Sequence, residues 1–163
     1  MHGLIRRYKD AREEKFFFAD TLAQEADAWH DFLDYIAKDE ECIIYCWADY
    51  EREPAMRCWE KYRGNEKGYK ILMGHLEDQC KWTREHFAFP TRSYSIKEIA
   101  PVFDFHWKTK GAKGTDCEIW YGEWVQSGDK SIRDRILEYN RDDVVAMEVI
   151  DDNLRKLAKT GGQ

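Results

Sequence analysis

The run SIRDRILEYNRDDVVAMEVIDDNLRKLAKT, residues 131–160, contains no Pro or Gly and carries a regular apolar pattern. Apolar or aromatic residues recur at steps of three and four, which is one face of an α-helix. One carboxylate, Asp143, interrupts this face, and Tyr139 stands one turn before it. The sequence therefore predicts a long amphipathic helix whose face consists of Ile132, Ile136, Tyr139, Asp143, Met147, Ile150 and Leu154.

A carboxylate within an apolar face costs free energy unless it is paired, protonated or bound to a metal ion. Two interpretations of Asp143 are therefore open. In the first, Asp143 is a structural group that caps a loop or pairs with an arginine. In the second, Asp143 and the hydroxyl group of Tyr139 reach the same functional site.

Composition and charge exclude several classes of protein. The chain has 163 residues, of which 43% are hydrophobic and 15% aromatic, so we expect one folded domain with a core. The net charge of −6 argues against broad electrostatic capture of nucleic acid, but it leaves room for a local basic groove around a metal-filled acidic site. No apolar run is long enough to cross a membrane. Five cysteines without a CxxC pair predict reduced thiols in a cytoplasmic protein.

Two apolar runs near the N-terminus, GLIRRY (3–8) and KFFFA (15–19), predict a hairpin joined by KDAREE. A helix over residues 23–37, capped by Asp20 or Thr21, is expected next. The run CIIYCW (42–47) is apolar at consecutive positions, which favours a strand buried on both faces.

Two carboxylates, Asp49 and Glu51, follow that strand directly and precede a helix predicted over residues 54–62. Sheets of α/β proteins bind ligands beyond the carboxyl ends of their strands, so this placement is typical of a site. The alternative is that these acids only place charge at the N-terminus of the helix.

Further along the chain, a helical segment is predicted to run to about residue 86 with Asp78 near its middle. Ser95 to Glu98 fits a capping box that opens a short helix. KTKGAKGTD (108–116) is expected to be a loop, either simply solvated or lying over a substrate groove. A Trp-rich helix over 117–126 ends before Gly128.

Several motifs together resemble a known family. YNRDDVVA contains Tyr139-x-x-x-Asp143, which resembles the third motif of DEDDy-type 3′–5′ exonucleases with a ribonuclease H-like fold. SYSIKEIAPVFDFHWK (93–108), followed by a WY-containing helix and EYNRDDV, closely resembles the YprB-like ribonuclease H-like domain of RecB-family nucleases. The similarity covers most of the chain.

The resemblance implies an α/β fold with a ribonuclease H-like mixed sheet flanked by helices. It also implies a site that binds Mg²⁺ or Mn²⁺. Tyr139 would orient the attacking water, and Asp143 would be a metal-binding carboxylate. Glu51 would be a second such carboxylate, with Asp49 as its substitute. Asp78 would join the metal-binding set or serve a structural purpose.

One motif of the family is not matched. Its first motif, Asp-x-Glu, lies on the first strand of the fold, and this sequence begins at the strand that follows. We therefore expect residues 1–163 to form a single ribonuclease H-like domain that lacks its first strand and belongs to a longer protein. The gap predicts self-association or a strand supplied by another segment.

The resemblance implies a metal-dependent nuclease that hydrolyses DNA or RNA, with exonuclease-like 3′–5′ action on single strands. The alternative is a non-catalytic, degenerate nuclease domain that binds a partner protein or nucleic acid. No GxSxG or P-loop motif points to a serine hydrolase or a nucleotide-driven enzyme. Five basic residues are candidates for phosphate contacts: Arg92, Lys97, Lys108, Lys110 and Lys113.

Overall fold

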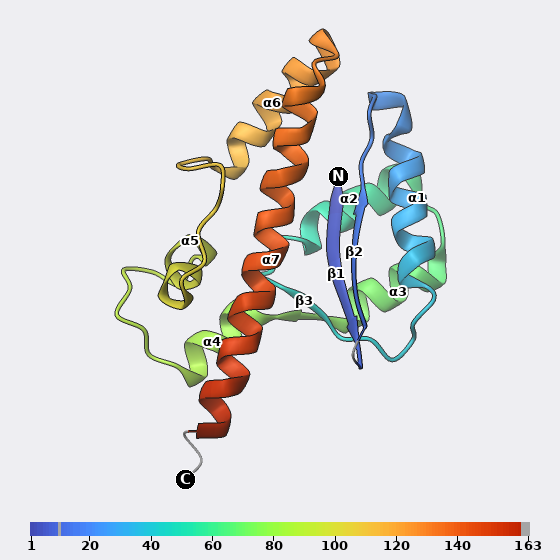
Figure 1. The fold of residues 1–163 in the computed structure, drawn as a ribbon. Coiled ribbons are helices and arrows are strands. Elements are labelled where there is room, and N and C mark those ends of the chain that lie inside the picture. Colours follow the sequence, from blue (N-terminus) through green and yellow to red (C-terminus); the bar gives the residue numbers. More distant parts are fainter. Residues whose placement is uncertain (10, 161–163) are drawn as a thin grey trace. The chain divides into compact units, whose positions relative to one another are not determined.

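The structure, a computed structural model, describes residues 1–9 and 11–160. In this part of the chain the strands form two sheets of two strands each (Figure 1). In one sheet, β1 (His2–Tyr8) pairs with β2 (Ala11–Phe17). In the other, β3 (Ile44–Cys46) runs parallel to β4 (Leu76–Asp78). Together with the surrounding helices, these strands confirm the predicted α/β class.

The chain divides into two compact units. The prediction of a single domain over residues 1–163 stays a prediction, and each unit is described by itself. Unit 1 contains Met1–His2, Phe17–Ala19 and Ala23–Ile99. Unit 2 contains Gly3–Phe16, Asp20–Leu22 and the chain from Ala100 onward.

Unit 1 is built on the packing of α1 (Glu25–Ile36) against α3 (Glu66–His75). Trp29 and Leu33 of α1 are fully buried. A Cβ atom at Gly68 would lie 2.1 Å from the backbone oxygen of Leu33, so only glycine permits this close approach of the two helices.

Trp29 also fixes the end of α2 (Arg52–Tyr62), because its indole N–H donates to the backbone oxygen of Arg63 at 2.7 Å. After β4 the chain continues into α4 (Gln79–His86) and then α5 (Ile96–Ile99). A short 3-10 helix, η1 (Leu22–Gln24), precedes α1.

Unit 2 is organised around α7 (Lys130–Thr160), the long helix predicted from its periodicity (Figure 1). The preceding α6 (Gly114–Ser127) packs against it, and Gly128 separates the two helices in the left-handed conformation that favours glycine, with φ of 67°. A 3-10 helix, η2 (Ala100–Phe103), also contacts α7. The buried residues of α7 are Ile136, Tyr139, Asp142, Ala146, Ile150 and Leu154.

Ion pairs join the hairpin to α7 within unit 2. The guanidinium of Arg141 donates to both carboxylate oxygens of Glu14, at 2.7 and 2.8 Å. Arg12 donates in the same way to Glu148, at 2.8 to 3.0 Å. These pairs explain why the polar residues 11–14 are part of a strand, because Arg12 and Glu14 both pair with charged residues of α7.

Three expectations for local structure were wrong. The KDAREE segment was predicted as a connection, but Ala11–Glu14 belongs to β2. The helix predicted through Asp78 is interrupted by β4, which pairs with β3. The strand predicted over 42–47 is shorter than expected and is not buried on both faces, since Ile43 and Tyr45 are 63% and 40% exposed. No helix in the described part of the chain combines the length and apolar character needed to cross a bilayer.

Candidate functional site

The carboxyl ends of β3 and β4 bring three of the predicted site residues together in unit 1. The two strands run parallel with Cys46 opposite Asp78, so they end at the same edge. Asp49 and Glu51 follow β3, and Asp78 is the last residue of β4. This is the edge at which α/β sheets place ligands, although the sequence pattern alone had put Asp78 inside a helix.

The backbone between β3 and α2 adopts an uncommon conformation. Ala48 and Asp49 are consecutive non-glycine residues in the left-handed region, with φ of 60° and 55°. Each such residue costs on the order of 1 kcal/mol, and such strain persists only where the surroundings enforce it. Here the backbone N–H of Ala48 donates to Asp78 Oδ1 at 2.9 Å. The indole of the buried Trp47 donates to the backbone oxygen of Tyr94 at 2.9 Å.

Asp78 has a clear structural task at this edge. It is the N-cap of α4, and its Oδ1 accepts from the backbone N–H of Lys81 at 3.1 Å as well as from Ala48. One carboxylate oxygen thus joins the β3 loop to the start of α4, which is the geometry expected of a capping Asp. Its role as a metal ligand stays a prediction.

Asp49 forms an ion pair that sequence reasoning missed. Arg52 Nε lies 2.9 Å from each carboxylate oxygen of Asp49. The other guanidinium nitrogens of Arg52 donate to the backbone oxygens of Met73, at 3.2 Å, and Leu76, at 3.3 Å. Because Arg52 stands three residues after Asp49 at the start of α2, the spacing was a signal for this pair.

The surroundings of Glu51 favour its protonated form. Desolvation raises the pKa of Glu51, and the negative charges of Asp49 and Asp78 act in the same direction. The Glu51 side chain is still partly exposed to water, and the water screens these charges and limits the rise of the pKa. Burial and the charge of Glu51 also raise the pKa of Cys46 to about 12, which keeps that thiol neutral.

Tyr139 and Asp143 lie one turn apart on α7 in unit 2. The indole N–H of Trp107 donates to Asp143 Oδ1 at 2.7 Å. Tyr139 is buried, with its ring against that of Trp120 at a centroid distance of 6.2 Å. Burial and the charge of Asp143 raise the pKa of Tyr139, so its phenol keeps its proton.

The most deeply buried carboxylate of α7 is Asp142, which sequence reasoning did not select. Asp142 is 3% exposed, and its Oδ2 accepts the backbone N–H of Lys108 at 2.8 Å. The available signal was the phase of the helix, because Asp142 lies three residues after Tyr139 and four before the buried Ala146. Lys108, predicted to meet phosphate, places its ammonium 2.9 Å from Glu138.

The predicted residues thus form two groups in separate units. Their carboxylate oxygens are the donors that Mg²⁺ and Mn²⁺ prefer, so the chemistry of the donors fits these ions. Over residues 1–9 and 11–160, however, no cluster of three or more His, Cys, Asp or Glu side chains is arranged to hold a metal ion. Metal binding by the predicted residues stays a prediction.

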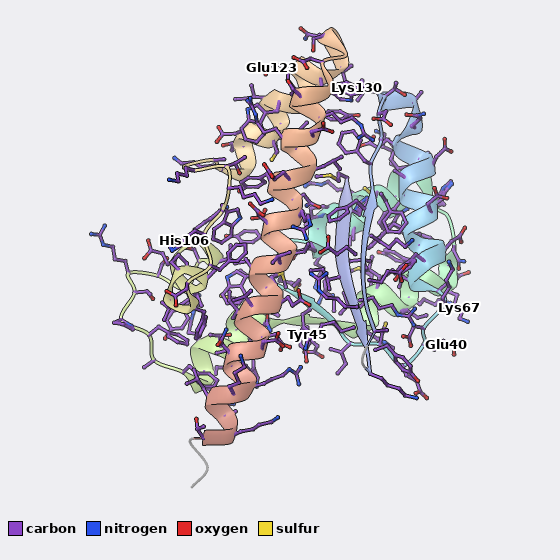
Figure 2. The ribbon with its side chains drawn as sticks, in the orientation of Figure 1. Glu40, Tyr45, Lys67, His106, Glu123 and Lys130 are labelled. Atoms are coloured by element: carbon purple, nitrogen blue, oxygen red, sulfur yellow. The ribbon has the colours of Figure 1, made fainter. Side chains whose placement is uncertain are left out.

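A surface hollow in unit 1 does not coincide with these groups. It has a volume of about 430 Å³, and its lysines are paired with acids: Lys67 with Glu40 and Lys70 with Glu66. Figure 2 shows Glu40 and Lys67 side by side, apart from Tyr45 of β3. The hollow is lined by Glu40, Glu66, Lys67, Lys70, Ile71 and His75.

In comparisons with known proteins, the chain matches a family model. The family model described as the RNase_H superfamily matches residues 1–155. No curated protein and no solved structure matches the chain.

Proposed function

The chain belongs to the RNase H superfamily, and on that premise we propose that it is a metal-dependent nuclease domain hydrolysing phosphodiester bonds in DNA or RNA. The proposal rests on one observation: three carboxylates lie at the carboxyl end of the parallel β3–β4 pair, namely Asp49, Glu51 and Asp78. The motifs at 93–108 and 139–143 support a place in the YprB-like group of RecB-family nucleases. They also support DEDDy-like 3′–5′ exonuclease action on single strands.

Each proposed residue has a distinct task. In unit 1, Glu51 is a metal-binding carboxylate that Asp49 and Asp78 support. In unit 2, Asp143 is a metal-binding carboxylate. Mg²⁺ or Mn²⁺ bound by these oxygens would supply stabilisation of charge on the attacking and leaving oxygens of the phosphodiester. Tyr139 keeps its proton because its pKa is raised, so its hydroxyl group is able to donate a hydrogen bond that orients the attacking water.

Titration calorimetry with Mn²⁺ tests this proposal. We expect saturable binding by the wild-type chain and a loss of affinity of about tenfold or more in D143N and in E51Q. The matched controls are D134N, an exposed Asp on the same helix, and E53Q, an exposed Glu on α2. Controls that bind like wild type support the assignment. A wild-type chain without saturable binding, or a D143N variant with full affinity, contradicts it.

A second candidate function is a non-catalytic domain that binds nucleic acid or a partner protein. Two contacts favour it, because each engages a carboxylate that metal binding would need. Arg52 forms an ion pair with Asp49, and the indole N–H of Trp107 donates a hydrogen bond to Asp143. Incubating a 5′-labelled single-stranded oligonucleotide with the chain and Mn²⁺ separates the candidates. Shortening of the label-bearing product that D143N abolishes supports the nuclease, whereas retention of an intact, bound oligonucleotide supports the second function.

The proposal extends to partners and location. The exposed Ile43, which directly precedes β3, and the exposed Tyr45 of β3 support self-association or pairing with a strand from another segment. Light scattering over a range of concentrations checks this, since a mass that stays at 19.5 kDa contradicts self-association. All five cysteines are unbridged, which supports a reducing, cytoplasmic location.

A further inference from the structure

A row of aromatic side chains, exposed at Trp82 and His86 and half-buried further along, lies on α4 and the segment that follows it in unit 1. Trp82 stays 44% exposed although its ring stacks on that of His86, with centroids 4.8 Å apart and planes 24° from parallel. Phe87 lies 5.6 Å from Trp82 by the same measure. The row then continues through Phe89 to Tyr94, with centroid distances of 6.2 and 6.4 Å. The indole of Trp82 therefore lies between the rings of His86 and Phe87 and still presents an apolar surface to water.

The row is held in place by hydrogen bonds from both sides. The Tyr94 hydroxyl donates to the backbone oxygen of Phe87 at 2.7 Å, which closes the segment between them. His86 Nδ1 donates to the backbone oxygen of Trp82 at 2.8 Å, which fixes the imidazole in its stacked position. A surface fixed before binding loses little conformational entropy when a ligand arrives.

The charge of this segment is opposite to that of the whole chain. Residues 79–97 contain four basic residues and one acid, whereas the chain carries a net charge of −6. Lys81, Arg84 and Arg92 are all exposed. The guanidinium of Arg84 also lies over the ring of Tyr94, 5.6 Å from its centroid. Exposed aromatic rings among cations fit the bases and phosphates of a single-stranded nucleic acid.

We propose that Trp82 and His86 form a stacking platform for an unpaired base of single-stranded nucleic acid, with Lys81 and Arg84 contacting the flanking phosphates. This inference rests on the proposed function and names the surface that holds its substrate. Trp82 stands four residues after Asp78, the cap of α4, which is about 6 Å along the helix axis. A strand stacked on Trp82 therefore passes close to the carboxylates at the end of β4.

Fluorescence anisotropy with labelled dT12 in EDTA tests the platform without any cleavage. Removing one base–aromatic stack lowers affinity by roughly 5- to 150-fold, so we expect a loss of that size in W82A. W82L keeps an apolar side chain of similar bulk and should lose as much, whereas W82F keeps a ring and should retain most of the affinity. If W82A does not fold, the affinity of W82L for dT12 is compared with that of wild type instead. The control is Y8A, which removes an aromatic of 58% exposure in unit 2.

Two further measurements sharpen the assignment. W82A should weaken binding of a blunt 12-base-pair duplex much less than binding of dT12, since only the terminal pairs of a duplex offer a free face. K81Q should lower the salt slope of dT12 binding by about 0.7, the value for one phosphate contact on a single strand. W82A and W82L that bind dT12 like wild type, a Y8A variant that loses as much, or a wild-type chain that does not bind overturn the platform. Because metal is absent from this assay, failure of Mn²⁺ binding would remove the nuclease proposal alone.

Discussion

Asp142 and Asp143 are consecutive carboxylates on α7, and neighbouring residues of one loop donate a hydrogen bond to each. The buried Asp142 accepts from the backbone N–H of Lys108, and the half-buried Asp143 accepts from the indole of Trp107. The two residues therefore differ in burial more than in bonding. We assign loop anchoring to Asp142 and keep Asp143 as the candidate ligand.

Replacing Asp142 should cost more stability than replacing Asp143. D142A leaves the Lys108 N–H without its charged acceptor, so we expect the free energy of unfolding to fall by about 1.5–3 kcal/mol. D143N keeps an oxygen that accepts from Trp107 and should change stability by less than about 1 kcal/mol. Urea unfolding followed by circular dichroism measures both values. An equal loss in the two variants would refute the division of roles.

Glu51 should make stability depend on pH. Its folded pKa lies above the ordinary value of 4.5, so the folded state favours the protonated form. The stabilisation from protonation is complete below 4.5 and is lost as the pH rises through the folded pKa. E51Q removes the charge and should therefore melt slightly above wild type at about pH 7, with the difference vanishing below about pH 4. Thermal melts at several pH values check this, and a lower melting temperature for E51Q at neutral pH would disprove it.

At the scale of elements, the hairpin depends on α7 for its charge partners. The Arg141 side chain lowers the pKa of Glu14 mainly through its hydrogen bonds. Stability from this pair is present above the ordinary value of 4.5 and is lost as the pH falls through the lower folded pKa. R141Q should reduce the free energy of unfolding by about 0.5–1 kcal/mol at neutral pH.

Salt and acid provide the check on R141Q. The difference from wild type should shrink in about 1 M NaCl, because the pair is partly exposed, and should close once the pH falls below the lowered pKa of Glu14. R57Q is a suitable control, because the Arg57–Glu53 pair on α2 is largely exposed and should contribute little. A deficit in R141Q that persists unchanged in high salt would mean that packing, rather than charge, joins the hairpin to α7.

Elements with strong helical periodicity were predictable from sequence, and short or charged strands were not. The predicted helices over 23–37 and 117–126 correspond to α1 and α6 within a few residues. β4 has only three residues and lies directly between two helices, so only its pairing with β3 reveals it. The acidic and basic residues of β2 resemble a loop until α7 supplies their partners. For the same reason, Arg52 and Trp107 entered the candidate site only once the tertiary structure was known.

At the scale of the whole molecule, the two units are interleaved along the sequence. The chain leaves unit 1 after His2, returns for Phe17–Ala19, leaves again, and returns for Ala23–Ile99 before unit 2 is completed. No single cut yields both units intact. We therefore expect one cooperative unfolding transition, with Trp fluorescence and far-ultraviolet circular dichroism giving coincident curves. Two separated transitions would contradict this expectation and the prediction of a single domain.

The pairing of Glu14 with Arg141 also has a consequence for synthesis on the ribosome, because the ion pair forms only after α7 has been translated. The two residues are 127 positions apart. At a translation rate of about 5–20 residues per second, Arg141 is synthesised roughly 6–25 s after Glu14. During that interval the strand edges and charged side chains of the hairpin are open to other nascent chains. Yield in a heterologous host should therefore respond to chaperone supply and growth temperature more than a chain with local contacts would.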